Sequence, residues 1–434
     1  MADSVSRRGF IGGAVTGAVG AGIAAAGVWQ ANKWSVLDGT KSIAQSSIGP
    51  VSGNQPLPGK FPGRVVEVNN PAITKVGRTN WGYQHRDRAE IKKVLSRGMK
   101  ELVGSTDSVE AWKHFFKPGD RVGIKVNPVG APDAISSHEI VLEIVEGLKS
   151  AGVNPQDILL FDRYKVEFAN CRYPQLADEA GIHWEVASAE YDETQLRLDG
   201  QRPDGQWEDK VSGYDPEVFR ELAFATPGTE KDPLCYKSHL CNIVSKKVDK
   251  FIAVPVLKDH RSSGVTFCLK NLSHGLVNNV CRSHLYYAGQ EGPGKCSNQC
   301  GTFIPAMVSL PPTRAKAVLQ IGDSAVATYE GGPGAWNRTW GVWNNGSLFF
   351  GTDPVAMDRI GWEIIDAKRA GMGWPRVGEM GLAASVGKNR VAKGLRDITE
   401  AFEIRQPEHI PLASTLGLGV FDRSKIEHVR YDIG

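Results

Sequence analysis

The sequence predicts an α/β protein in which helices flank a mostly parallel sheet. Short apolar runs of strand length alternate with longer segments of helical spacing, and this repeated strand-then-helix order is typical of parallel sheets. Of the 434 residues, 41% are hydrophobic and 23% are charged, which is enough apolar material for a large core. The formal net charge of +3 and the lack of an arginine-rich run in the sequence argue against a nucleic-acid partner.

Residues 1–28 are predicted to be a twin-arginine export signal and not part of the fold. The run Ser6-Arg7-Arg8-Gly9-Phe10-Ile11 fits the pattern S-R-R-x-F-L with Ile in the last place, and an uncharged segment rich in Gly and Ala follows it up to Val28. A membrane anchor is the alternative, because about 18 apolar residues just reach spanning length. We expect a periplasmic protein that the twin-arginine export machinery carries folded, anchored in the membrane if the signal stays uncleaved.

A linker rich in Ser, Gly and Pro follows over residues 29–63 and leads into a single large domain over residues 64–434. At the start of this domain, the alternation in 64–68 predicts an edge strand, and the apolar spacing in 88–103 predicts a helix. The next three segments have the lengths of a βαβ unit. They are a strand at 121–127, a helix at 137–151 and a strand at 157–161.

The second half of the chain begins with a polar region over residues 171–236, whose Gly and Pro content predicts an insertion or a cap. After it, Asp353 is a natural N-cap and Pro354 a natural first residue of a helix that runs to about residue 370. Three further strands are expected, at 250–256, 317–321 and 348–351.

Polar side chains follow the buried strands of this predicted sheet. In open α/β sheets the ligand binds beyond the carboxyl ends of the strands, so we expect these side chains to converge on one rim. They are Lys125 and Asn127 after the first strand, Asp162 and Arg163 after the second, Lys258, Asp259 and His260 after the third, and Asp323 after the fourth.

The densest group of such residues lies between Lys258 and Gly275. Two lysines, two histidines, an arginine and an asparagine make this stretch cationic and rich in hydrogen-bond donors, which suits an anionic ligand. A solvated loop with ordinary surface charges is the alternative. The apolar residues around Lys270 and Asn271 favour a site, because a lysine in such surroundings needs a partner or a ligand.

A second group of residues suggests a metal site. Cys281, His284, Cys296 and Cys300 could supply four soft ligands, although their spacing is not that of a zinc ribbon or a ferredoxin. A Cys296–Cys300 disulfide or buried free thiols are the alternatives. The chain has seven cysteines, so at least one stays unpaired if the others form disulfides.

Three segments resemble the domain-of-unknown-function family 362: the run from Lys258 to Gly275, the strand end at Lys125 and Asn127, and Gly351 to Asp358. The likeness extends over about residues 122–370 and implies an α/β fold, but the family has no established activity. Some relatives are described as iron–sulfur proteins with a ferredoxin-type cysteine run, which this sequence lacks.

These patterns lead to the hypothesis of an exported enzyme that acts on a small anionic substrate, with a bound cofactor or metal of open identity. The alternatives are a non-catalytic binding or assembly component of an envelope complex, and an iron–sulfur electron-transfer protein. For Asp353 the alternative is a capping role alone. The candidate catalytic residues are His260, His274, Lys258, Lys270 and Asp162, and the candidate cofactor-binding residues are Lys125, Asn127, Asn271, Asp323 and Asp353.

Overall fold

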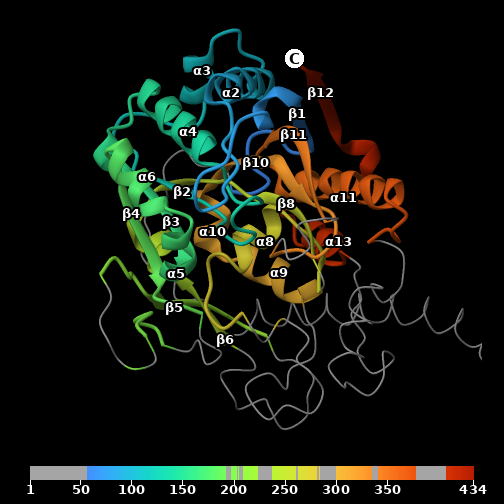
Figure 1. The fold of residues 1–434 in the computed structure, drawn as a ribbon. Helices are drawn as coiled ribbons and strands as arrows, with labels where there is room; N and C mark the ends of the chain where they lie inside the picture. The colour runs from blue at the N-terminus through green and yellow to red at the C-terminus, as the bar shows by residue number, and fades with distance from the viewer. Residues whose placement is uncertain are drawn as a thin grey trace, which may run out of the picture. The chain divides into compact units, whose positions relative to one another are not determined.

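One mixed sheet organises the part of the chain that the structure describes. This computed structural model describes residues 56–191, 197–202, 204, 209–222, 237–260, 262–280, 283, 300–334, 341–377 and 407–434, so the predicted signal and most of the predicted linker lie outside it. Ten strands form the sheet, most neighbouring strands run parallel, and helices lie on both faces (Figure 1), which confirms the predicted fold class. The order is β12 (Glu427–Asp432), β1 (Arg64–Asn69), β11 (Val342–Gly351), β10 (Ala317–Thr328), β7 (Lys250–Ala253), β2 (Val122–Lys125), β3 (Ile158–Tyr164) and β4 (His183–Ser188), while β8 (Val256–His260) pairs with β10 and with β9 (Gly264–Thr266).

Side chains of the strands contribute to two apolar cores, one on each face of the sheet. In β1, Val66 and Val68 join the larger core and Val65 joins the smaller one, because successive strand residues point to opposite faces. Helices α8 (Cys268–Ser273) and α11 (Pro354–Gly371) cover the smaller core, and α9 (Cys300–Val308) and α13 (His409–Thr415) pack against them. The larger core is covered by α2 (Arg88–Val103), α3 (Ser108–Lys113), α4 (His138–Ser150), α5 (Lys165–Asn170) and α6 (Tyr173–Ala180), and α10 (Pro311–Lys316) immediately precedes β10.

The predicted βαβ unit is formed by β2, α4 and β3. Ser137 immediately precedes α4, and the chain leaves the helix through Gly152, whose φ of +91° lies in the left-handed region that favours glycine. Strands β2 and β3 are parallel, with Lys125 opposite Phe161. The carboxyl ends of both strands therefore meet at the same edge of the sheet.

Three predicted strand boundaries in the second half are wrong, and the differences move candidate residues. The strand expected at 250–256 is two strands, β7 and β8, because Pro255 between them has no N–H for the ladder. Strand β10 runs on to Thr328, so Asp323 lies inside a strand and not after one. The strand expected at 348–351 is the end of β11, which runs antiparallel to β10. The carboxyl end of β11, which Asp353 follows, therefore lies at the opposite end of the strands from the carboxyl ends of β2 and β3.

Two further expectations change at the borders of the sheet. Strand β1 is not an edge strand, because β12 pairs with it on the outer side. The polar region at 171–236 is only partly an insertion, because β4 within it pairs with β3 of the main sheet and α6 precedes β4. Its later part contributes β5 (Tyr214–Glu221), which pairs with β6 (Lys237–Cys241) as a separate ribbon. Among the helices of the described residues, none combines the length and the apolar character needed to cross a membrane.

Candidate functional site

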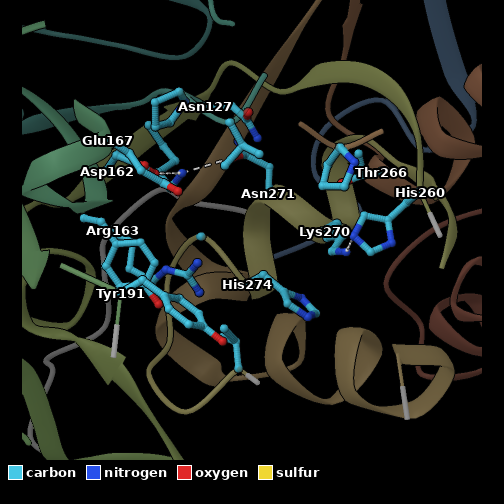
Figure 2. A pocket seen from close by; sticks show the side chains of 17 residues that line it. Asn127, Asp162, Arg163, Glu167, Tyr191, His260, Thr266, Lys270, Asn271 and His274 are labelled. Carbon is cyan, nitrogen blue, oxygen red and sulfur yellow. Dashed lines mark hydrogen bonds and ion pairs between the residues drawn. The ribbon is translucent and has the colours of Figure 1, made fainter. Parts of the chain in front are cut away.

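A cavity of about 450 Å³ opens at the carboxyl ends of β2 and β3, next to β8, β9 and α8 (Figure 2). Its position agrees with the rule that ligands of α/β sheets bind beyond the carboxyl ends of the strands. Lys258 lies behind the cavity wall, whereas Asp323 and Asp353 do not line the cavity. The candidate residues that line it are Lys125, Asn127, Asp162, His260, Lys270, Asn271 and His274.

Lys125 is held by a buried ion pair on one wall of this cavity. Its Nζ contacts the Asp162 carboxylate and donates hydrogen bonds to Val126 O at 2.6 Å and to Asn271 Oδ1 at 3.0 Å. Both charged side chains are buried, so each neutralises the other where solvent cannot. Lys125 therefore orients Asn271 and has no net charge left for a ligand.

Several hydrogen-bond donors in the cavity wall have no partner among the described residues. They are the Nε and Nη1 atoms of Arg163, the Nδ2 atom of Asn271 and the hydroxyl of Tyr164. The Arg163 guanidinium lies 4.0 Å from the centroid of the Tyr164 ring, and in Figure 2 it extends into the space beside Tyr191. A buried donor without a partner costs about 1–3 kcal/mol, so this arrangement is suited to a ligand that accepts these hydrogens.

Lys270 and His260 face each other on the opposite wall of the cavity (Figure 2). The backbone N–H groups of Ser262 and Ser263 donate to His260 Nδ1, at 3.0 and 3.2 Å. A neutral His260 ring therefore carries its hydrogen on Nε2, the atom that contacts Lys270 Nζ. Because Nε2–H is a donor, the amine of Lys270 must accept, which requires its neutral form.

Burial acts on the Lys270 amine in the same direction. Desolvation is the largest cause that lowers its pKa to about 7; the positive charge of Arg163 lowers it further, while Cys300 acts the other way. The hydrogen-bond pattern and the burial thus both favour an uncharged amine near neutral pH. An amine in this state can accept a proton or attack an electrophile.

Lys258 is a second lysine whose pKa is lowered by burial, and it lies behind the cavity wall. It is fully buried, and its Nζ donates to Asn127 Oδ1 at 3.0 Å. Burial is the largest cause that lowers its pKa to about 7, against the raising effect of Cys171 and of nearby carboxyl groups such as Glu167. Asn127 separates this amine from the cavity, so Lys258 supports the wall and does not line it.

His274 is bound by hydroxyl groups on both sides of its ring. Its Nδ1 lies 3.1 Å from Ser273 Oγ, and its Nε2 lies 2.7 Å from Ser283 Oγ. Since the Ser283 hydroxyl donates to Val280 O at 2.6 Å, it accepts from Nε2–H. These contacts fix the ring in one orientation at the cavity wall.

The two remaining candidate aspartates, Asp323 and Asp353, accept hydrogen bonds that stabilise the fold. Asp323 accepts from the backbone N–H and the hydroxyl of Ser137, at 2.8 and 2.6 Å, and from Ala325 N–H at 2.9 Å. Asp353 caps α11 and also accepts from two distant backbone N–H groups. Its four donors are the backbone N–H groups of Gly63, Val355, Ala356 and Val420, all at 2.9–3.0 Å.

The predicted metal ligands Cys281, His284 and Cys296 lie outside the described residues. Cys300, the fourth, is buried at the start of α9, and its Sγ lies 3.2 Å from Ser283 O. Within the described residues, no three His, Cys, Asp or Glu side chains are grouped to hold a metal ion.

The cavity also contains residues that the sequence did not single out. Tyr164 and Thr266 follow or end strands, so the strand-end rule could have included them, as it included Arg163 among the polar strand ends. Glu167 lies on α5, a short helix that no pattern predicted. Burial is the largest cause that raises the pKa of Glu167, which favours its neutral form.

Fold and cavity together define an α/β protein with a donor-rich site at the strand ends. The chain belongs to the family of the domain of unknown function DUF362, whose model matches residues 122–363. This match confirms the resemblance seen in the sequence and extends from β2 into α11, including every strand that borders the cavity. A search of curated proteins finds no significant match.

Proposed function

We propose that this protein is an enzyme that binds a small organic monoanion, a carboxylate, in the cavity and uses the neutral amine of Lys270 in its chemistry. One observation carries the proposal: the unpartnered donors of Arg163 and Asn271 line the same cavity as an uncharged lysine. One carboxylate oxygen can accept a charge-assisted hydrogen bond from a guanidinium N–H group of Arg163, and the other can accept from an amide N–H group such as that of Asn271 Nδ2. The ligand would thereby satisfy donors that the protein leaves unsatisfied.

The charges around the cavity favour a single negative charge on the ligand. Lys125 and Asp162 cancel each other, and Lys270 is uncharged in the state that its hydrogen bond requires. Burial is the largest cause that raises the pKa of Glu167, while the charge of Arg163 lowers it. Arg163 therefore brings at most one uncompensated positive charge to the wall, which suits a monocarboxylate better than a phosphate dianion.

This proposal changes the roles that the sequence suggested. Lys125 cannot hold an anion while it pairs with Asp162, so that role passes to Arg163. His260 donates to Lys270 and has its other nitrogen occupied by backbone N–H groups. The proton acceptor in the cavity is therefore Lys270 and not His260.

Calorimetric titration with acetate, lactate and pyruvate tests the anion site. Replacing Arg163 with Gln removes the charge but keeps a polar side chain, and we expect binding to weaken roughly 10- to 100-fold, as for a lost charged hydrogen bond. Arg121→Gln is the matched control, because Arg121 is exposed and paired with Asp249 away from the cavity. Equal affinities for wild type and Arg163→Gln would contradict the proposal.

We further propose that the protein works in the periplasm, after export through the twin-arginine pathway. This part rests on the run from Ser6 to Ile11 and on the uncharged segment after it.

A further inference from the structure

The cavity is lined by two lysines whose chemistry differs. Lys125 is charged and fixed by Asp162, so its lone pair is unavailable. Lys270 forms no ion pair with a carboxylate of the described residues, and its amine contacts a neutral imidazole. Burial also lowers the pKa of Lys258, but Asn127 separates its amine from the cavity. Lys270 alone among these three combines a free-base amine with access to the cavity.

A free-base amine beside an anion site suggests a particular substrate class. The carboxylate would be held by Arg163 and Asn271, and the atom next to it in a 2-oxo acid is an electrophilic carbonyl carbon. Lysine amines in desolvated sites attack such carbonyls. We propose that Lys270 forms an imine with the carbonyl carbon of a small 2-oxo monocarboxylate, an inference that rests on the proposed anion site.

The step balances without an oxidant or a reductant. The lone pair of Lys270 Nζ forms a bond to the carbonyl carbon, and the π electrons of the C=O bond move to oxygen. A proton passes from the amine nitrogen to that oxygen, which gives a carbinolamine. The hydroxyl then leaves as water with a second proton from nitrogen, and the C=N bond forms. One amine and one carbonyl are consumed, and one imine and one water are produced.

His260 sets the geometry from which this attack starts. Its Nε2–H holds the amine lone pair in the resting state, and two backbone N–H groups hold the ring. Because this contact is between neutral groups, releasing the lone pair breaks no ion pair. His260 therefore holds the Lys270 side chain in place as a neutral amine whose lone pair can be released for attack.

Reductive trapping tests the inference on the full-length protein. The protein is incubated with pyruvate and sodium borohydride, digested and mapped by mass spectrometry. We expect one reduced pyruvyl group on the peptide that contains Lys270, and faster trapping as the pH rises through about 7. Lys270→Met should lose this adduct, whereas the matched variant Lys258→Met should keep it. The position of the adduct in the wild type decides the matter even if a variant fails to fold.

Lactate separates this inference from the proposed function, since it has the same carboxylate but no carbonyl. If pyruvate and lactate bind by calorimetry and no adduct forms at Lys270, the imine is refuted and the anion site stands. If neither acid binds and no adduct forms, both proposals fail. Labelling spread evenly over surface lysines, unaffected by Lys270→Met, would also overturn the imine.

Discussion

Lys258→Met should make the protein more stable near neutral pH. The lysine is fully buried behind the cavity, where burial lowers the pKa of its amine from 10.5 to about 7. In the unfolded chain the amine is charged at pH 7, so folding must either bury this charge or remove the proton, and both cost free energy. Methionine has a similar shape and no charge, and it relieves the folded state of this penalty.

The size of the effect follows from the two pKa values. Below the folded pKa of about 7 the penalty of Lys258 is complete, at about 5 kcal/mol; it decreases as the pH rises and disappears above the unfolded value of 10.5. It is therefore about 4 kcal/mol at pH 7 and about 2 kcal/mol at pH 9. The variant loses the hydrogen bond to Asn127, which is worth about 1–2 kcal/mol. We expect Lys258→Met to raise the free energy of unfolding by about 2–3 kcal/mol at pH 7 and by almost nothing at pH 9.

Urea denaturation of the wild type and the variant at both pH values measures this difference. Lys250→Met is the matched control: Lys250 is also buried, but it donates to Asp120 Oδ2 at 2.7 Å and to Phe115 O at 2.9 Å. Removing it leaves the Asp120 carboxylate buried without its ion-pair partner, so the free energy of unfolding of this variant should be about 3–5 kcal/mol lower than that of the wild type. The reasoning is refuted if Lys258→Met is less stable than the wild type at pH 7, or if its advantage is the same at both pH values.

The other two predictions concern residues away from the cavity. Asp353→Ala removes the acceptor of four backbone N–H groups and should lower the free energy of unfolding by about 2–4 kcal/mol in urea titrations, with unchanged pyruvate binding; weaker binding at unchanged stability would instead support a ligand role. Replacing Arg7 and Arg8 with Lys should keep the protein in the cytoplasm, measured by cell fractionation and immunoblotting; unchanged periplasmic accumulation would exclude the twin-arginine route.

Most of the fold could be predicted because its central strands are short apolar runs with turn or loop residues at each end. Strands β4 and β12 are among those that the sequence patterns missed, and their residues are largely exposed or half-buried. Without β12 the pattern in β1 looked like an edge strand. Pairing partners that lie hundreds of residues apart, such as Val66 and Val429, leave no local signal in one sequence.

The candidate site was predictable as far as strand direction could be assumed. Asn127, Asp162 and His260 reach the cavity from parallel strands or the loops after them. Asp353 does not, because periodicity cannot show that β11 runs antiparallel. The pairing of Lys125 with Asp162 depends on the register of two strands, so its consequence, a lysine unavailable to a ligand, required the structure.

The distribution of costly polar groups is what separates the cavity from the rest of the molecule. A buried ion pair elsewhere satisfies both of its members, because Glu330 pairs with Arg369 at the end of α11. Unpartnered polar atoms alone do not identify a ligand site, because Gln320 inside β10 has two of them. In the cavity, however, the free donors of Arg163 and Asn271 coincide with the neutral amine of Lys270. Each of these features lowers stability, and one carboxylate with an adjacent carbonyl would satisfy the donors and use the amine. Because these costs occur together in one place, we propose a ligand of this kind for the cavity.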